Sequence, residues 1–232
     1  MALTPLKKIS SPIVIAIDGP AGAGKSTVAK ELARRLGFAY LDTGAMYRAL
    51  TLKAIEERKD LENEDEIVAM AHRTVIDLKM NHEKQLRVFL DGQDVTQDIR
   101  SEKVTNNTFH IARAPGVREI MVGWQRKIGS QTNIVVEGRD IGTVVFPKAT
   151  RKFYLDADFA ERSRRRIEEL RQKGKAVNES QLKNELQERD HKDFTRETGP
   201  LRKAQDAVSI DSTRMTIDDT VDAILKYIPS YA

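Results

Sequence analysis

Eight residues near the start of the chain have the spacing of a phosphate-binding loop. Residues 19–26, Gly-Pro-Ala-Gly-Ala-Gly-Lys-Ser, match the pattern G-x-x-x-x-G-K-[ST]. Small residues let the backbone wrap around a phosphate, and a helix that starts there adds partial positive charge. The lysine of such a loop reaches the β- and γ-phosphates of ATP, and the next hydroxyl ligates Mg²⁺. We therefore expect an ATP site made of Gly19, Pro20, Ala21, Gly22, Ala23, Gly24, Lys25, Ser26 and Thr27, with Ser26 as the metal ligand.

The segments on either side of this loop favour that interpretation. Residues 13–18 form a short β-branched run that is typical of a buried strand. In residues 25–36 the apolar side chains recur at helical spacing, and Gly37 stands where a helix would end. Strand, loop and helix in this order are the context that a phosphate-binding loop requires. The alternative is a glycine-rich strand-to-helix turn that binds nothing.

The loop alone does not define the reaction. A GTPase should carry a D-x-x-G switch and an N-K-x-D guanine-reading motif, and the chain has neither. A motor or transporter ATPase usually needs a longer chain and an acidic pair after an apolar strand, whereas Glu137 is followed by Gly-Arg-Asp. The remaining large class is that of small-molecule kinases, in which the rest of the chain supplies an acceptor site.

Composition and charge narrow the class further. The 232 residues, 40% hydrophobic and 32% charged, predict a globular protein, and the absence of cysteine excludes disulfides and thiolate chemistry. The net charge is +4. Residues 161–203 hold 13 Lys and Arg against 9 Asp and Glu, whereas the remainder holds 26 of each. An Arg-rich segment favours phosphate-bearing partners, either a nucleotide or a nucleic acid.

No targeting segment is evident in the sequence. Apolar runs such as 13–17 are far too short to span a membrane, and the first twelve residues contain no signal-peptide core. We therefore expect a cytoplasmic protein without a membrane partner, and we expect a monomer.

Alternating apolar runs and helical segments predict an α/β fold. Five runs (13–18, 38–42, 133–138, 152–157 and 207–211) predict a five-stranded parallel sheet flanked by helices on both faces. Helices are predicted at about 46–58, 101–128 with a break near 115–116, 159–171, 179–189 or beyond, and 216–227. Two β-rich runs, 75–80 and 86–92, interrupt the alternation and predict an inserted hairpin, with a third short strand in 91–96.

Polar residues follow two of the predicted strands. Thr43, Tyr47 and Arg48 come after the second strand, and Arg139 and Asp140 come after the third, at the edge where α/β sheets bind ligands. Their hydroxyl, guanidinium and carboxyl groups suit a phosphorylated acceptor. The alternatives are a helix cap with a core tyrosine in the first stretch, and a local Arg–Asp pair in the second.

A third group lies on a predicted helix. Arg189, Asp193 and Arg196 fall at i, i+4 and i+7, so they share one face if the segment is helical. A solvated ladder of ion pairs is the alternative.

Together with the phosphate-binding loop, these stretches resemble the bacterial cytidylate kinases. The resemblance runs from about residue 13 to 228 and rests on Asp42–Arg48, Val117-Arg118-Glu119, the string 137–147 (EGRDIGTVVFP), and Glu188-Arg189-Asp190 with Asp193 and Arg196. It implies a nucleoside monophosphate kinase that transfers the γ-phosphate of ATP to CMP or dCMP, giving CDP or dCDP and ADP. It also implies one kinase domain over 1–232, with a monophosphate-binding insertion at about 60–112 and a helical lid at about 159–200.

The resemblance assigns roles to individual residues. Thr43, Tyr47 and Arg48 would contact the acceptor nucleotide, Arg139 would hold its phosphate, and Arg118 and Asp140 would read cytosine. A carboxylate suits the N4 amino group of cytosine, and an arginine suits its O2 and N3 acceptors. Arg189 and Asp193 would lie near the sugar hydroxyls and Arg196 near the phosphate. The expected catalytic set is Lys25, Arg139 and Arg196.

Two points remain open within this resemblance. Arg162, Arg165 and Arg166 resemble the start of a lid that closes over ATP, and of these Arg162 and Arg166 are expected at the ATP site; a solvated charged face is the alternative. Many relatives have a serine facing the base nine residues before the match to Arg118. This chain has Phe109 there, and the neighbouring hydroxyl is Thr108.

Two other classes of function compete with this one. Another P-loop kinase, such as a UMP/CMP, thymidylate or shikimate enzyme, would differ in its acceptor. A nucleic-acid-binding ATPase would need a basic surface outside the predicted lid, where the charges are balanced. We therefore expect small-molecule substrates, CMP and dCMP, and no nucleic acid partner.

Overall fold

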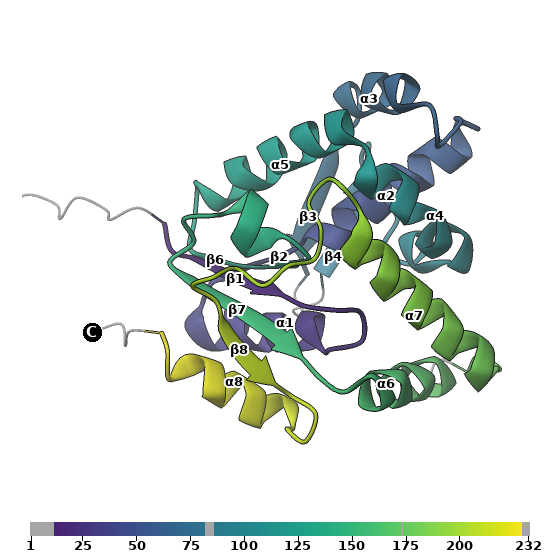
Figure 1. Ribbon diagram of the computed structural model, residues 1–232. Helices are drawn as coiled ribbons and strands as arrows, with labels where there is room; N and C mark the ends of the chain where they lie inside the picture. The colour runs from purple at the N-terminus through teal and green to yellow at the C-terminus, as the bar shows by residue number, and fades with distance from the viewer. Residues whose placement is uncertain (1–11, 82–85, 173, 229–232) are drawn as a thin grey trace, which may run out of the picture.

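β1 (Val14–Asp18) lies at the centre of a five-stranded parallel sheet in the computed structural model, which describes residues 12–81, 86–172 and 174–228 (Figure 1). The order is β2-β6-β1-β7-β8. The other strands are β2 (Ala39–Asp42), β6 (Ile134–Gly138), β7 (Arg151–Asp156) and β8 (Val208–Asp211). All four neighbouring pairs are parallel, so the predicted fold class and its five strands are confirmed.

Helices cover both faces of this sheet because the strand side chains alternate between two cores. Val14 and Ala16 of β1 join the core under α2 (Thr43–Glu56) and α5 (Pro115–Gly129). Ile15 and Ile17 join the core under α1 (Lys25–Leu36) and α8 (Ile217–Leu225). A strand buried on both faces reads as a continuous apolar run, which is why the sequence reveals it.

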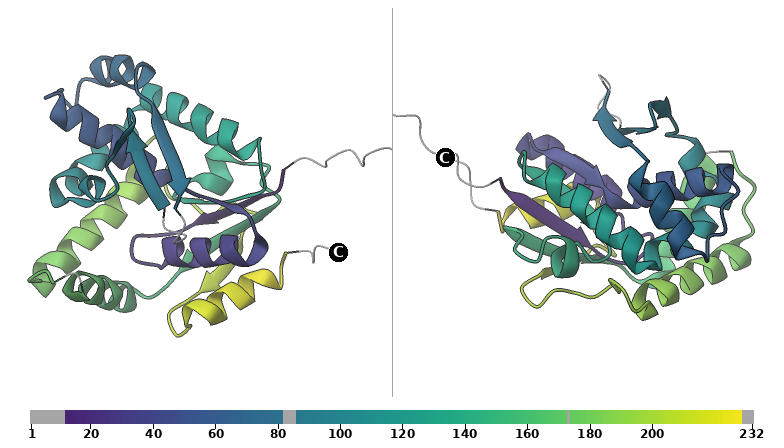
Figure 2. Two further views of the ribbon diagram at one scale, coloured as in Figure 1. Left: turned by 180° about the vertical axis from the view of Figure 1, so that it is seen from behind. Right: turned by 90° about the horizontal axis from the view of Figure 1, so that it is seen from above.

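A smaller antiparallel sheet is inserted between α2 and α5. It consists of β3 (Ile76–Met80), β4 (Leu86–Leu90) and β5 (Gln93–Asp94), and it projects beside α2 (Figure 2). Leu86, Val88 and Leu90 are buried. The predicted hairpin and short third strand are confirmed, and the connecting turn lies largely outside the described residues.

Other helices of the insertion differ partly from expectation. The structure adds α3 (Glu64–His72) and a 3₁₀ turn (Asp98–Arg100), and α4 (Glu102–Arg113) is separated from α5 at Ala114. α2 begins three residues earlier than predicted because Asp42 caps it: the Ala45 N–H donates to Asp42 Oδ1 at 2.8 Å. An aspartate at this position satisfies a helix N–H that has no partner within the helix.

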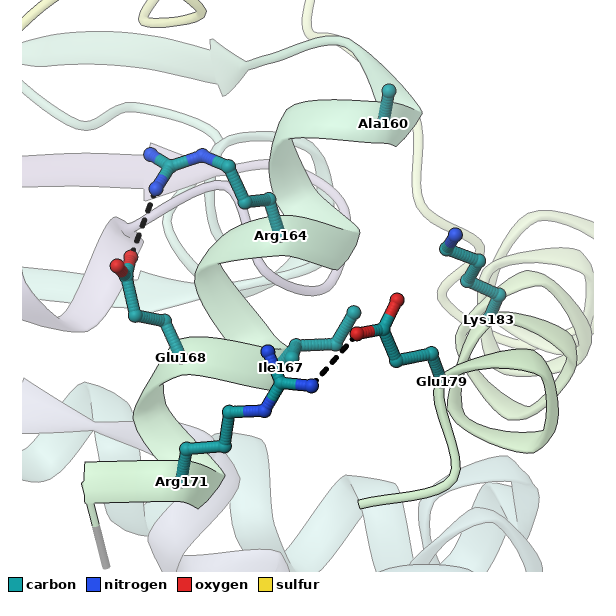
Figure 3. A pocket seen from close by; sticks show the side chains of 7 residues that line it. All are labelled: Ala160, Arg164, Ile167, Glu168, Arg171, Glu179 and Lys183. Atoms are coloured by element: carbon teal, nitrogen blue, oxygen red, sulfur yellow. Dashed lines mark hydrogen bonds and ion pairs between the residues drawn. The ribbon is translucent and has the colours of Figure 1, made fainter.

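Two charged helices lie side by side beyond the main sheet (Figure 1). They are α6 (Phe159–Gln172) and α7 (Glu179–Thr195). A hollow of about 260 Å³ separates parts of them, and Figure 3 shows that its lining is mostly charged, with Ile167 as the large apolar side chain. An ion pair between Arg171 and Glu179, 2.8 Å apart, joins the two helices at this hollow.

No helix in the described part of the chain is both long enough and apolar enough to cross a membrane.

Candidate active site

The predicted phosphate-binding loop connects β1 to α1. Gly24 has φ +86°, a left-handed conformation that glycine adopts without steric cost, and α1 starts at the next residue. Lys25 is only 6% exposed, and its Nζ donates to the Pro20 carbonyl at 2.7 Å. The lysine is therefore folded back over its own loop, where a phosphate oxygen can replace the carbonyl as its acceptor.

A carboxylate from the neighbouring strand faces this lysine. Glu137 is the next-to-last residue of β6, is 4% exposed, and accepts a hydrogen bond from the Tyr40 hydroxyl at 2.5 Å. Burial, followed by the positive charge of Arg139, lowers the pKa of Lys25 to about 7, while Glu137 acts against that shift. Burial and the nearby Asp42 raise the pKa of Glu137.

The donor groups near Ser26 fit a Mg²⁺ ion that keeps water and phosphate ligands. Ser26 is exposed in the first turn of α1, and hydrogen bonding with it lowers the pKa of Glu137. One hydroxyl and one carboxylate are oxygen donors of the kind that Mg²⁺ takes together with substrate phosphates. Among the described residues no group of three or more His, Cys, Asp or Glu could hold a metal without such additional ligands.

Asp18, at the end of β1, fixes the loop that carries Arg139 and Asp140. Its two carboxylate oxygens accept the N–H groups of Ile141 at 2.7 Å and Gly142 at 2.8 Å. The loop then makes a single wide helical turn in which the Val145 N–H donates to the Asp140 carbonyl at 3.1 Å. Burial raises the pKa of Asp18 to about 6, although both backbone N–H groups favour its charged form.

Asp140 is the centre of a buried group that we name the Asp140 cluster: Asp140, Arg118, Arg196 and Tyr47. Arg118 Nη2 pairs with Asp140 Oδ2, and Arg196 Nη2 lies 3.7 Å from Asp140 Oδ1. Arg118 Nη1 also donates to the Tyr47 hydroxyl at 3.3 Å. Burial raises the pKa of Asp140, and the two guanidinium groups oppose that shift. The structure thus brings both expected cytosine readers together.

Arg139, the preceding residue, points into a second group. Its Nε donates to Asp193 Oδ2 at 2.7 Å. Burial, then the charge of Arg139, lowers the pKa of Arg189 to about 10, and Arg48 and Arg166 contribute in the same direction. Arg48 Nε is buried without a recorded hydrogen-bond partner among the described residues. Crowded cations and a buried donor without a partner fit an acceptor that carries negative charge. We name Arg139, Asp193, Arg189 and Arg48 the Arg139 cluster.

Arg196 lies elsewhere than the helical spacing suggests. α7 ends at Thr195, so Arg196 follows the helix and does not continue its face. Its Nε donates to the Gly199 carbonyl at 2.7 Å, and its ion-pair partner is Asp140. The prediction that Arg189, Asp193 and Arg196 share one helical face is therefore wrong for Arg196, whose backbone turns away from the helical conformation.

The expected acceptor residue Thr43 and the two residues at the position of the relatives' serine, Thr108 and Phe109, contact other protein groups. The Thr43 hydroxyl donates to the Glu137 carbonyl at 2.7 Å, and the Thr108 hydroxyl donates to the Val104 carbonyl at 2.7 Å. Phe109 has the Lys192 ammonium of α7 5.7 Å from its ring centroid. Phe109 therefore supplies a contact between α4 and α7, and it offers no hydroxyl to a base.

The arginines of α6 approach the phosphate-binding loop in different ways. Arg162 Nη1 donates to the Ala21 carbonyl at 2.8 Å, and Arg165 Nη2 donates to the Ser212 carbonyl at 2.6 Å. Arg166 pairs with Glu169 at 2.7 Å and adds to the positive charge around Arg189. The described contacts of Arg162 are to protein groups, and its contact with ATP stays a prediction.

Sequence reasoning missed three carboxylates of the site: Asp18, Glu137 and Asp190. Asp18 is the last residue of β1 and Glu137 the next-to-last of β6, and an acid directly after an apolar run was a signal that could have identified them. Asp190 shares the buried face of α7 with Leu186, four residues earlier. The resemblance included Asp190 in the stretch Glu188-Arg189-Asp190 but assigned it no role.

A phosphate-binding loop on a parallel five-stranded sheet, with a cationic second site at the same sheet edge, defines a P-loop kinase. The chain belongs to the cytidylate kinase family, whose model matches residues 15–230. It is 50% identical to the cytidylate kinase of Desulforamulus reducens over 214 residues, covering 92% of this chain and 96% of that protein. It is 51% identical to the cytidylate kinase of Pelotomaculum thermopropionicum over 211 residues, covering 91% and 93%.

Solved structures also share the fold. An uncharacterized protein from Eubacterium ventriosum superposes with a TM-score of 0.51 at 15% identity, covering 94% of this chain and 99% of that one. At this identity the likeness concerns the fold alone.

Proposed function

We propose that the protein transfers the γ-phosphate of ATP to CMP or dCMP, producing CDP or dCDP and ADP. The observation that carries this proposal is the position of Arg139, between the donor and acceptor sites. Arg139 is near enough to Lys25 to lower the lysine pKa, it pairs with Asp193, and it is adjacent in sequence to Asp140. One residue thus links the loop that binds ATP to a buried site for a base.

The chemistry of this transfer needs no general base. The acceptor is a phosphate monoester, whose second pKa of about 6 leaves it mostly dianionic at neutral pH. Catalysis therefore consists of positioning the reactants and stabilising the charge of the transferring group. We assign this charge stabilisation to Lys25 and Arg139, with Arg196 and the cations of the Arg139 cluster.

The acceptor site has two parts, one for the phosphate and one for the base of the nucleotide. The Arg139 cluster offers Arg48 Nε and Arg189 to the acceptor phosphate or sugar, with Asp193 close to the sugar hydroxyls. The Asp140 cluster offers a carboxylate for the N4 amino group and guanidinium groups for O2 and N3 of cytosine. Thr43 and Tyr47, both on α2, belong to the same acceptor site. Both pyrimidine ribo- and deoxyribonucleotides fit this division.

ATP would be bound by residues 19–27 and by Arg166, with Arg162 supporting the loop through the Ala21 carbonyl, and Mg²⁺ would be bound by Ser26. When bound, the metal neutralises developing charge on the β- and γ-phosphates. Lys25 replaces its bond to the Pro20 carbonyl with one to a phosphate oxygen. Glu137 lies within hydrogen-bonding reach of Ser26, and its carboxylate would help to hold the metal site.

Two segments would close over the reactants. The insertion at about 60–112 covers the monophosphate, and the lid at about 159–200 covers ATP. Water must be excluded, since it would otherwise accept the phosphoryl group, and lid closure performs that exclusion. The hollow between α6 and α7 and their many surface ion pairs are consistent with a segment that moves.

The test is a coupled assay of ADP release with CMP, dCMP, UMP, AMP and dTMP as acceptors. We expect CMP and dCMP to exceed the other acceptors by at least ten-fold in kcat/KM. A preference for UMP or dTMP would assign the chain to another monophosphate specificity.

We further propose a cytoplasmic monomer without a nucleic acid partner. Light scattering after gel filtration checks its mass. Titration with labelled RNA at low and high salt checks binding, because a nucleic-acid partner would bind tightly at low salt and weakly at high salt.

A further inference from the structure

An ion pair outside the acceptor site holds one residue of the phosphate-binding loop from both sides. The Ala21 N–H donates to Asp190 Oδ1 at 3.0 Å, and Arg162 Nη1 donates to the Ala21 carbonyl at 2.8 Å. Arg162 Nη1 also donates to Asp190 Oδ2 at 2.5 Å. Arg162 and Asp190 are 8% and 7% exposed. Two side chains from α6 and α7 therefore fix both backbone polar groups of Ala21.

The close approach of α6 makes this contact specific. A Cβ on Gly22 would lie 3.1 Å from the Arg162 carbonyl oxygen and 3.2 Å from Arg162 Cβ. A side chain here would be strained at φ +78° and would require the helix to move away by a few tenths of an ångström. Arg162 is also anchored at its own helix start, since its Nε donates to the Ala157 carbonyl at 3.0 Å.

A buried ion pair is costly to desolvate unless its remaining donors and acceptors are satisfied. Here the backbone of Ala21 and Ala157 supplies those partners, so the pair is stable only when the loop has this conformation. No hydrogen bond from the backbone N–H of Gly22, Ala23 or Gly24 to another described residue is present. These N–H groups, together with those of the first turn of α1, are left for phosphate oxygens.

We propose that Arg162 and Asp190 are positioning residues that clasp Ala21 and keep the phosphate-binding loop in its ATP-binding shape. The proposal rests on the proposed function only for the identity of the nucleotide. In this proposal Arg162 does not contact ATP itself. It acts on ATP binding by holding Ala21 in place. The same contacts anchor the first turn of α6 and the later part of α7 to the loop.

The experiment compares Arg162→Met, Asp190→Asn and their double variant with the wild-type chain. Matched controls are Arg164→Met on α6 and Glu188→Gln on α7, whose side chains are 60% and 64% exposed and form ion pairs within their own helices. Amide hydrogen exchange of residues 19–27 is measured without nucleotide. Affinities for ADP and for CMP are measured separately by calorimetry, and KM for ATP and CMP by the coupled assay.

We expect both single variants to raise exchange in residues 19–27 and to weaken ADP binding at least ten-fold, with CMP binding changed less than two-fold. The double variant should bind ADP no more weakly than either single variant, because each removes the same clasp. The two control variants should match the wild type in exchange of residues 19–27 and in ADP affinity. Should Arg162→Met fail to fold, the isosteric Asp190→Asn variant carries the test alone.

Several outcomes would overturn the clasp. Unchanged exchange in residues 19–27 would show that Arg162 and Asp190 do not hold the loop. Equal losses of ADP and CMP affinity would show a general effect on folding. A loss of ADP affinity in Arg162→Met but not in Asp190→Asn would restore direct contact between Arg162 and ATP. If the wild-type chain phosphorylates no monophosphate but the variants still loosen the loop and weaken ADP binding, the proposed function fails and the clasp stands. A wild-type chain that binds no ADP would overturn both.

Discussion

Two guanidinium groups face the buried carboxyl group of Asp140 and favour its charged form. Burial alone would favour its neutral form and raises its pKa, whereas Arg118 and Arg196 stabilise the carboxylate. A cytosine amino group can share this carboxylate with them, but a uracil O4 would bring a second acceptor against it. Two facing acceptors leave a desolvated group without a partner, at a cost of about 1–3 kcal/mol.

Asp140→Asn should therefore reduce the preference for CMP over UMP. An amide can turn its NH₂ toward O4, so we expect the CMP/UMP ratio of kcat/KM to fall at least ten-fold, mainly through poorer use of CMP. The coupled assay with both acceptors measures this ratio. Arg139→Ala is the comparison: it should weaken both acceptors equally, because their phosphate is the same. An unchanged ratio in Asp140→Asn would make Asp140 only a structural partner of the arginines.

The low pKa of Lys25 predicts proton uptake on nucleotide binding. Burial and Arg139 lower this pKa to about 7 in the nucleotide-free chain, and phosphate charge beside the ammonium should raise it again. ADP affinity should then fall as pH rises above about 7, by up to ten-fold per pH unit. Calorimetry at pH 8 in buffers of different ionisation enthalpy measures the proton directly. Lys25→Met is the control, and uptake that persists in it would assign the proton to another group.

At the scale of elements, Asp18 joins β1 to the loop after β6, and this contact has a pH dependence of its own. Burial raises its pKa from 3.8 to about 6, so the folded chain holds this proton more tightly than the unfolded chain. The contribution of Asp18 to the free energy of unfolding is therefore greatest below about pH 4 and is lost as the pH rises through 6.

Urea denaturation of the wild type and of Asp18→Asn tests this sign. Between pH 4 and pH 7 the free energy of unfolding of the wild type should fall relative to that of the variant by about 2 kcal/mol. Asp219→Asn is the matched control, since hydrogen bonds with Thr216 lower the pKa of this exposed cap. The contribution of Asp219 to the free energy of unfolding should instead be lost as the pH falls. A constant difference between wild type and Asp18→Asn would contradict a raised pKa.

The elements were predictable to the extent that their signals are local. Buried strands read as apolar runs, and the loop motif lies within eight residues, so the sheet, the hairpin and the ATP loop follow from the sequence. The contacts of Asp18 with Gly142 and of Asp190 with Ala21 span 124 and 169 residues. Such contacts depend on which side of a helix or strand end meets a distant backbone, and no short pattern records that. The end of α7 at Thr195 was not predicted for the same reason. The contacts of Arg196 after the helix, with Asp140 and with the Gly199 carbonyl, have no short sequence pattern.

At the scale of the whole molecule, both charged helices should respond to the two substrates together. Amide exchange in the part of the lid between Arg162 and Asp190 should slow several-fold when ATP and CMP analogues are both bound, and little with CMP alone. This segment has few large buried apolar side chains, Ile167 and Leu186 among them, so its local stability is low without ligands. Exchange of α8, which packs against α1 and β8, serves as the internal control. Equal exchange in all states would indicate a static structural role for α6 and α7.

The central place of β1 has a consequence for how the protein is made. β1 pairs with β6 and β7, so its two neighbours begin about 120 and 137 residues later in the chain, at Ile134 and Arg151. During synthesis the loop that follows β1 leaves the ribosome long before either neighbour exists. Such non-local pairing is slow to form, and domains acquire their fold only as their parts emerge. Nascent chains stalled before β7 has emerged should therefore lack protease protection at β1, and ATP cannot assist the folding of this protein until most of the chain has been translated.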